Sequence, residues 1–121
     1  MKLKIIEGSF AVCKLKDPSH INLDQDFVFI GKTDEETSLV CNEKVVPKNV
    51  SEEEKGFSLI KIEGLLDFSL VGIISEISGV LAKNNISIFV VSTYNTDYFL
   101  IKENNIEKTK KALLEKGYEF I

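Results

Sequence analysis

The C-terminal half of the chain alternates strand-like and helix-like segments, and this limits its folds more than any other feature. Residues 57–63 alternate between two faces, as strand residues do, and residues 86–92 form a continuous apolar run typical of a central strand. Between them, apolar residues recur at helical spacing from Leu70 to Leu81. Asp67 or Ser69 can cap this helix, and Asn84-Asn85 ends it.

The remaining segments complete a βαββαβ order. A polar turn over 93–96 is followed by a strand over 98–102. Asn104 or Asn105 opens a second helix that Gly117 stops, and residues 118–121 form a short final strand. This order predicts a ferredoxin-like α+β fold, with antiparallel sheets and helices on one face.

The first half reads as a reduced copy of the same plan. Strands are expected over 9–15, 27–32 and 37–43, whereas the polar segments 17–24 and 47–54 have room only for short helices. The turn over 33–37 precedes its strand just as the turn over 93–97 precedes Tyr98. The charged run 51–56 is expected to be a solvated connector or helix turn. We therefore predict two modules in tandem, a degenerate one over 1–55 and a complete one over 56–121.

Charge and composition exclude several classes of function. The net charge is −4, and all fifteen basic residues are Lys. Nucleic-acid binders need a basic face, so we expect no nucleic-acid partner. The absence of Arg also removes bidentate guanidinium clamps on carboxylates. His20 is the single histidine, and its polar surroundings indicate a solvated loop rather than a catalytic or metal-binding role.

The cellular setting expected from the sequence is the cytoplasm. No apolar stretch is long enough to span a bilayer, and Glu7 interrupts the N-terminus before a signal-peptide core develops. Cys13 and Cys41 sit in apolar strand-like runs, where buried free thiols are the expected state and a cross-strand disulfide is the alternative. Their spacing matches no metal motif, and we expect neither a metal nor a cofactor.

The segment 68–74 spans a loop and the first turn of a helix. Backbone N–H groups lack intrahelical partners there and, with the helix dipole, can hold a carboxylate. Gly72 would let such a ligand approach the backbone, although a glycine here could equally serve close packing against a neighbouring element.

The segment 92–98 places seven hydrogen-bonding side chains between two apolar strands. Part of this polarity is what any turn contains. Asp97 is more informative, because a partly buried carboxylate needs a cationic or multiply donating partner and the chain has no Arg. A ligand ammonium group would be such a partner.

These two segments resemble the ACT domain proteins of the tandem, amino-acid-sensing type, which include small bacterial proteins and the cytosolic arginine sensors of animals. The resemblance rests on Phe68-Ser69-Leu70-x-Gly72-Ile73 and on Ile86-Ser87-Ile88-Phe89-x-x-Ser92-Thr93-Tyr94-x-Thr96-Asp97-Tyr98. It also extends to the first half, over residues 11–15 and 33–41. It implies two ACT-like modules with a small molecule bound where modules meet. The pocket walls that it implies are Ser69, Leu70, Val71 and Gly72 on one side and Thr93, Tyr94, Asn95, Thr96 and Asp97 on the other.

The predicted function is therefore to bind a free amino acid or a close analogue without transforming it. No nucleophile–base pair or cluster of metal ligands stands out, so we do not expect an enzyme. Two other classes share the βαββαβ plan. An RNA-recognition motif needs aromatic and basic strands, and a metallochaperone needs paired cysteines in the loop over 63–69, which has none. The alternative that remains is a ligand-free protein–protein interaction module. In either case we expect a homodimer, with a regulated protein as a further partner.

Overall fold

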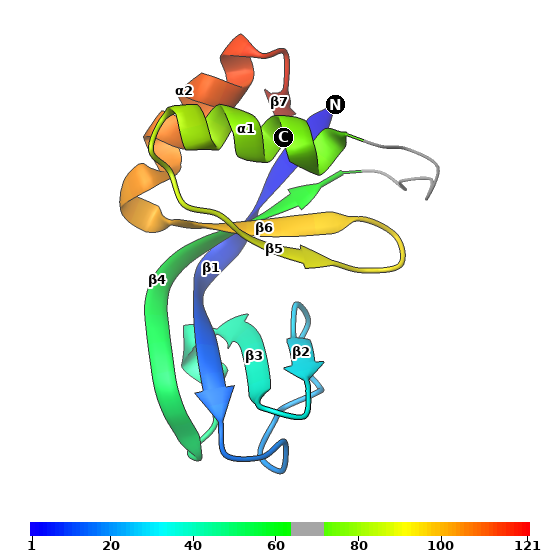
Figure 1. The fold of residues 1–121 in the computed structure, drawn as a ribbon, viewed down its shortest axis with the longest axis vertical. Coiled ribbons are helices and arrows are strands. Elements are labelled where there is room, and N and C mark those ends of the chain that lie inside the picture. Colours follow the sequence, from blue (N-terminus) through cyan, green and yellow to red (C-terminus); the bar gives the residue numbers. More distant parts are fainter. Residues whose placement is uncertain (64–71) are drawn as a thin grey trace. The chain divides into compact units, whose positions relative to one another are not determined.

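The computed structural model describes residues 1–63 and 72–121 (Figure 1). They divide into two compact units: residues 1–7 with 58–121, here called the terminal unit, and residues 8–57, here called the inserted unit. The chain passes between the units within two long strands, β1 (Lys2–Leu15) and β4 (Val50–Ile62). Gly8 and Gly56, next to these crossings, have φ angles of 108° and 81°, which glycine adopts without strain.

The terminal unit has the predicted βαββαβ order, with the end of β4 as its first strand. The elements that follow are α1 (Ile73–Lys83), β5 (Phe89–Ser92), β6 (Asp97–Lys102), the 3₁₀ turn η2 (Glu103–Asn105), α2 (Ile106–Glu115) and β7 (Glu119–Phe120). The observed strands start and end within a few residues of the expected ones. The chain thus has a mixed α+β fold, as the sequence predicted.

The edge of this sheet differs from the all-antiparallel arrangement that we expected. The strand order is β1–β4–β6–β5, with β7 beside β1, and β7 pairs with β1 in parallel. The backbone N–H of Glu63 donates to the carbonyl of Lys2 (2.9 Å), and that of Ile121 donates to Leu3 (2.9 Å). The first residues of β1 therefore lie between the end of β4 and β7. Our reading began this strand at residue 9, so it missed the segment that separates them.

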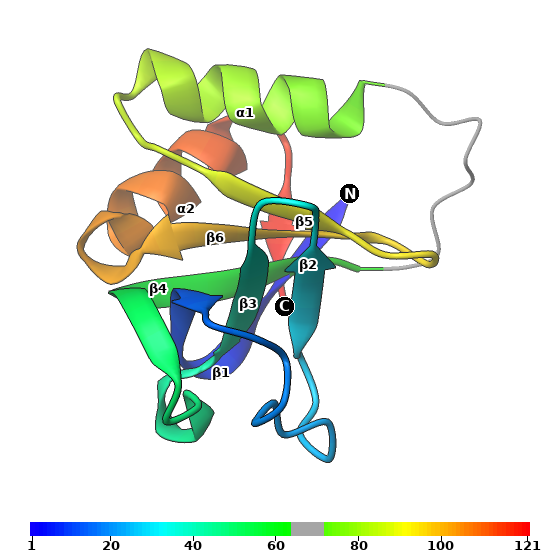
Figure 2. The same cartoon turned by 60° about the horizontal axis from the view of Figure 1, so that its bottom comes forward.

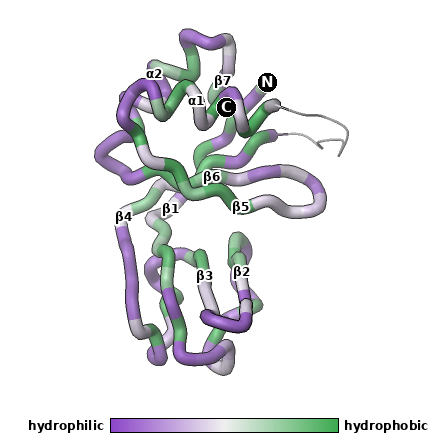
Figure 3. The backbone as a smooth tube through the Cα atoms, in the orientation of Figure 1, coloured by the Kyte–Doolittle hydropathy of each residue, from purple (hydrophilic) through white to green (hydrophobic). Residues whose placement is uncertain are grey.

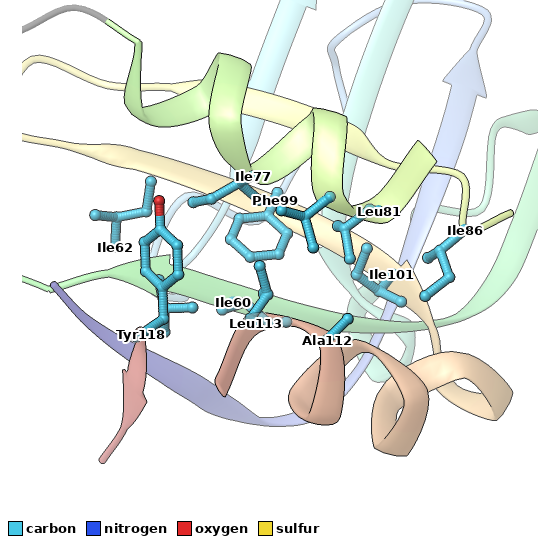
Figure 4. Packing of buried hydrophobic residues seen from close by; sticks show 12 residues of the cluster. Ile60, Ile62, Ile77, Leu81, Ile86, Phe99, Ile101, Ala112, Leu113 and Tyr118 are labelled. Atoms are coloured by element: carbon cyan, nitrogen blue, oxygen red, sulfur yellow. The ribbon is translucent and has the colours of Figure 1, made fainter. Parts of the chain in front are cut away.

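Both helices cover one face of the sheet in the terminal unit (Figure 2). Their apolar sides and the sheet share one buried core, in which Phe99 of β6 is fully buried (Figure 4). The helical spacing seen in the sequence is the spacing of this face. The core consists of Leu3, Ile60, Ile62, Ile77, Val80, Leu81, Ile86, Phe99, Ile101, Ala112, Leu113 and Tyr118.

The inserted unit is a sheet in the order β2–β3–β1–β4, with β2 (Phe29–Lys32) and β3 (Thr37–Asn42) antiparallel. The 3₁₀ turn η1 (Glu43–Val45) follows β3. The short helix expected over 17–24 is absent, and this segment forms turns instead. Asp17 and Asn22 explain the turns, because each accepts a hydrogen bond from the backbone two residues later, at Ser19 and Asp24 (2.9 and 3.0 Å).

The charged run 51–56 is also not the connector or helix turn that we expected. It belongs to β4, as does most of the second short helix predicted over 47–54. Figure 3 shows this part of β4 as hydrophilic, and residues 51–55 are exposed. The backbone of β4 is paired with β1, so tertiary pairing outweighs the low strand propensity of Glu and Lys here.

One hairpin occurs in both units with the same dimensions. The residue numbers of its elements differ by 60 throughout: β2 and β5 start at 29 and 89, β3 and β6 at 37 and 97, and η1 and η2 at 43 and 103. The strand registers match as well, with Phe29 opposite Val40 and Phe89 opposite Leu100. The N–H of Thr33 donates to Glu36 as that of Thr93 donates to Thr96, both at 2.9 Å.

Candidate functional site

Three parts of the terminal unit lie at the same end of its sheet. They are the start of α1, the end of β4 and the β5–β6 turn (Figures 1 and 2). The hydroxyl of Thr96 donates to the carbonyl of Ile62 (2.7 Å), which fixes the turn to the end of β4. The structure does not describe residues 64–71. These include the predicted site residues Ser69, Leu70 and Val71, and the proposed helix cap Asp67.

Gly72 is the residue that caps the N-terminus of α1. Its φ of 89° and ψ of −6° lie in the left-handed region, and its carbonyl accepts the N–H of Glu76 (2.8 Å). A Cβ built at this position would meet nothing within 4 Å. The requirement for glycine therefore comes from backbone conformation rather than from close packing, which was the alternative left open above. Among the described residues, no side chain caps this helix start.

The β5–β6 turn is held by its two threonines. The hydroxyl of Thr93 donates to the carbonyl of Thr96 (2.8 Å) and accepts the N–H of Thr96 (3.4 Å). Thr96 is buried, so both threonine hydroxyls serve the turn and its anchoring to β4. Tyr94 and Asn95 lie between them at the tip, where both are exposed.

Asp97 begins β6 opposite Ser92 and is half-buried. It shares a strand face with Phe99 and Ile101, which pack into the core beneath the helices. Among the residues that the structure describes, no hydrogen bond or ion pair reaches its carboxylate. A half-buried carboxylate on the helix-covered side, near the start of α1, is a suitable contact for a cationic group.

Glu63, at the end of β4, adds a second acid at this end of the unit. One carboxylate oxygen lies 3.6 Å from Nζ of Lys61. The other oxygen, Oε2, is buried and has no hydrogen-bond partner within the described ranges. Strand alternation puts Glu63 on the same face as Lys61, the face opposite Ile62 and the helices.

Sequence reasoning missed the pair formed by Glu76 and Tyr118. The Tyr118 hydroxyl donates to Oε1 of Glu76, in the first turn of α1. Burial raises the pKa of Tyr118 to about 12, and the hydrogen bond and negative charge of Glu76 act in the same direction. No local pattern could have revealed the pair, because its members are 42 residues apart in the chain.

The single histidine, possible metal ligands and possible membrane helices were the other features considered from the sequence. His20 lies exposed in a loop of the inserted unit, as expected. Nowhere in residues 1–63 and 72–121 do three or more His, Cys, Asp or Glu side chains gather as metal ligands would. Within the same ranges, no helix has the length and apolar character needed to cross a membrane.

Comparison with known protein families shows to which family the chain belongs. A family model described as ACT domain matches residues 52–115, which is more than half of the 121-residue chain. The chain belongs to the ACT domain family. A second model, described only as an N-terminal domain, matches residues 8–49. No curated protein matches the chain.

Several solved structures share the fold of this chain. A crystal structure of a protein from Agobacterium tumefaciens is 35% identical, with a TM-score of 0.87, and the match covers 99% of this chain and 91% of that one. A Vibrio cholerae protein of unknown function, described as a possible transport protein, is 20% identical with a TM-score of 0.71, over 94% and 88% of the two chains. The regulatory subunit of aspartate kinase from Thermus thermophilus has the same fold at 8% identity, with a TM-score of 0.63 over 93% and 95%.

Proposed function

We propose that this ACT domain protein is a non-catalytic regulatory sensor that binds a free amino acid or a close analogue. The observation that carries the proposal is the half-buried carboxylate of Asp97, which has no partner among the described residues. It lies on the helix-covered face, at the end of the unit where α1 begins at Gly72. The regulatory subunit of aspartate kinase, which has the same fold, adds support for a regulatory role.

The two halves of an α-amino acid would use different chemistry at this site. The ligand carboxylate would accept hydrogen bonds from N–H groups of the Leu70–Gly72 turn, at the positive end of the helix dipole. The ligand ammonium would contact Asp97. Ser69 and Val71 on one side, and Thr93, Tyr94, Asn95 and Thr96 on the other, would complete the pocket walls. Since the hydroxyls of Thr93 and Thr96 bond within the protein, we assign both residues a shaping role.

The tandem organisation and the dimer belong to the same proposal. The hairpin that recurs with an offset of 60 residues supports two ACT-like modules, of which the inserted one has lost both helices. We expect a homodimer, because ACT modules commonly pair to complete a sheet or a pocket. Light scattering that gives 13.6 kDa over the micromolar range would contradict the dimer.

The first experiment is a thermal-shift screen of the purified protein with each of the twenty common amino acids. A ligand that binds the folded state raises the melting temperature once its concentration exceeds its dissociation constant. We expect stabilisation by one amino acid or a small group, with affinity of about 1 μM, or about −8 kcal/mol. If none of them stabilises the protein, the ligand-free interaction module replaces this proposal.

The second experiment tests Asp97 directly by calorimetry with the amino acid that the screen selects. Asp97→Asn keeps the size of the side chain but removes its charge, and should weaken binding by about 1.5–3 kcal/mol. Asp34→Asn is the matched control, because Asp34 is an exposed acid in the equivalent turn of the inserted unit. Equal affinity in Asp97→Asn and wild type would refute the ammonium contact.

A further inference from the structure

Tyr118 connects the end of α2 with the start of α1. Its side chain is 6% exposed and packs in the core of the terminal unit, where its hydroxyl points toward α1 beside Ile62 (Figure 4). The hydroxyl donates to Oε1 of Glu76. Because the core encloses the ring, packing fixes the position of the hydroxyl.

Glu76 links Tyr118 to Gly72, the residue that caps α1. Its backbone N–H donates to the carbonyl of Gly72 (2.8 Å), and that is the first helical hydrogen bond of α1. One residue thus bonds to Tyr118 through its side chain and to Gly72 through its backbone.

Few other contacts to the start of α1 are found within residues 1–63 and 72–121. Gly72 offers no side chain, and no side-chain cap from these residues bonds to the first turn. Ile73 and Ile74 are half-buried against the core, whereas Ile77 is the first fully buried residue of the helix. Helix ends open more readily than helix centres, so a hydrogen bond to a buried group in the first turn has a disproportionate effect there.

We propose that Tyr118 is a positioning residue, which acts through Glu76 to hold the first turn of α1, capped by Gly72, in the conformation that receives the carboxylate of the amino acid. The part that concerns the turn stands on the contacts above, whereas the part that concerns the ligand rests on the proposed function. The experiment therefore has one readout that needs no ligand and a second that does.

The ligand-independent readout is hydrogen exchange of the Glu76 amide, compared with the Ile101 amide in the centre of β6. Tyr118→Phe removes only the hydroxyl, and we expect the protection of Glu76 to fall about fivefold or more while that of Ile101 changes less. If both amides lose protection equally, Tyr118 acts on global stability alone and the proposal is wrong. Unchanged protection of Glu76 would overturn it as well.

Two variants of Glu76 test whether the effect passes through this residue. Glu76→Gln keeps a carbonyl acceptor for the Tyr118 hydroxyl and should retain most of the protection, whereas Glu76→Ala should lose it. The double variant Tyr118→Phe with Glu76→Ala should be no worse than either single variant, because both remove one interaction. Additive losses would show that the two residues act separately, and would contradict the proposal.

Thr109→Val is the matched control for loss of a buried hydroxyl. Thr109 is fully buried on α2, and no hydrogen bond to its hydroxyl is found among the described residues. This variant should leave the ratio of Glu76 to Ile101 protection as it is in wild type. A fall like that of Tyr118→Phe would show that the start of α1 responds to any change in the core.

The ligand-dependent readout is calorimetry with the amino acid that stabilises the wild type most in the screen of twenty. Tyr118→Phe should weaken its binding about fivefold, and Glu76→Gln should leave it near the wild-type value. If Tyr118→Phe changes exchange at Glu76 but not affinity, the link to the ligand is refuted. If no amino acid binds the wild type, the proposed function fails, while the exchange data still decide whether Tyr118 positions the turn.

Discussion

The hydroxyl of Thr96 donates a 2.7 Å hydrogen bond to the carbonyl of Ile62, and both residues are buried. Ile62 is the last residue of β4, and Thr96 is the last residue of the turn before Asp97. This side-chain bond adds to the pairing of β6 with β4 in holding the β5–β6 turn at the end of β4. The same contact places Asp97 where the neighbouring strand ends.

The first prediction concerns this contact. Thr96→Val keeps the shape of the side chain but leaves the buried carbonyl of Ile62 without its donor, so we expect the free energy of unfolding to fall by about 1–3 kcal/mol. Urea denaturation measures the change. Thr37→Val is a suitable control, since Thr37 is a buried threonine at the equivalent hairpin for which no such side-chain bond is found in the described chain. An equal loss in both variants would contradict a specific role for the Thr96 bond.

The terminal unit was predictable because its hydrophobic pattern and its structure have the same period. Apolar residues at helical spacing became the buried side of α1, with Ile77 and Leu81 in the core. The continuous apolar run ahead of the polar turn became β5, although this strand starts at Phe89 rather than at residue 86. Local patterns of this kind are visible wherever the neighbouring element only has to cover one face.

The errors lie where distant pairing determines the structure. Glu52 and Lys55 are exposed residues of a strand whose backbone is paired with β1, and no local alternation marks them as strand residues. The start of β1 was missed for the same reason. Its partner strands lie far along the chain, β4 in the middle and β7 near the C-terminal end. Single-sequence patterns hold no information on which distant strand completes a ladder.

In the candidate site, the sequence singles out Gly72 and Asp97 because their residue types conflict with ordinary local roles: a glycine at a helix start and a carboxylate at the edge of a core strand. The structure shows Gly72 as the cap of α1 and Asp97 as the first residue of β6, and their contact with a ligand stays a prediction. The anchoring function of Thr96 and the contact between Tyr118 and Glu76 were not found, because each joins residues more than 30 positions apart.

The second prediction compares two glycines of one helix region. Gly72 has a positive φ, so Gly72→Ala should destabilise the protein by about 1–2 kcal/mol even though the space around the position is open. Gly79 lies inside α1 with equally open surroundings, and Gly79→Ala should stabilise the protein by about 0.5–1 kcal/mol. Thermal unfolding of both variants gives the signs. A stabilising Gly72→Ala would exclude the left-handed conformation at the cap.

The left-handed conformation of Gly72 also limits which substitutions can test the candidate site. Gly72→Val would strain the backbone as well as fill space, so lost binding in that variant could not be assigned to steric exclusion. Asp97→Asn is therefore the better probe of the site.

The third prediction concerns the buried hydroxyl of Thr109. The residue is fully buried on α2, and its Oγ1 lacks a hydrogen-bond partner within residues 1–63 and 72–121. Thr109→Val exchanges this unsatisfied hydroxyl for a methyl group of similar size. We expect the free energy of unfolding to rise by about 1 kcal/mol, measured by urea denaturation. A loss of stability would mean that the hydroxyl has a partner after all.

The two cysteines form a close pair in the core of the inserted unit. Cys13 and Cys41 are free thiols on adjacent strands, and both are buried. They are diagonal neighbours, because Cys41 lies opposite Ala11 and Cys13 lies opposite Leu39. The prediction of buried free thiols is thus confirmed, and a disulfide is not present. Burial, with a smaller contribution from the neighbouring Cys13, raises the pKa of Cys41 to about 12, and burial also raises the pKa of Cys13.

The fourth prediction follows from these raised pKa values. The thiols of the unfolded chain ionise near pH 9, whereas the folded protein holds Cys41 protonated until about pH 12. The folded state therefore binds more protons in this range, and stability that is fully present below pH 9 is lost as the pH rises toward 12. By about pH 10 the Cys41 thiol should have lowered the free energy of unfolding by about 1.4 kcal/mol. Urea denaturation at intervals from about pH 7 to about pH 10 should show a shallower decline in Cys41→Ala than in wild type. Equal slopes in the two proteins would mean that the thiol of Cys41 ionises as readily in the folded state as in the unfolded chain.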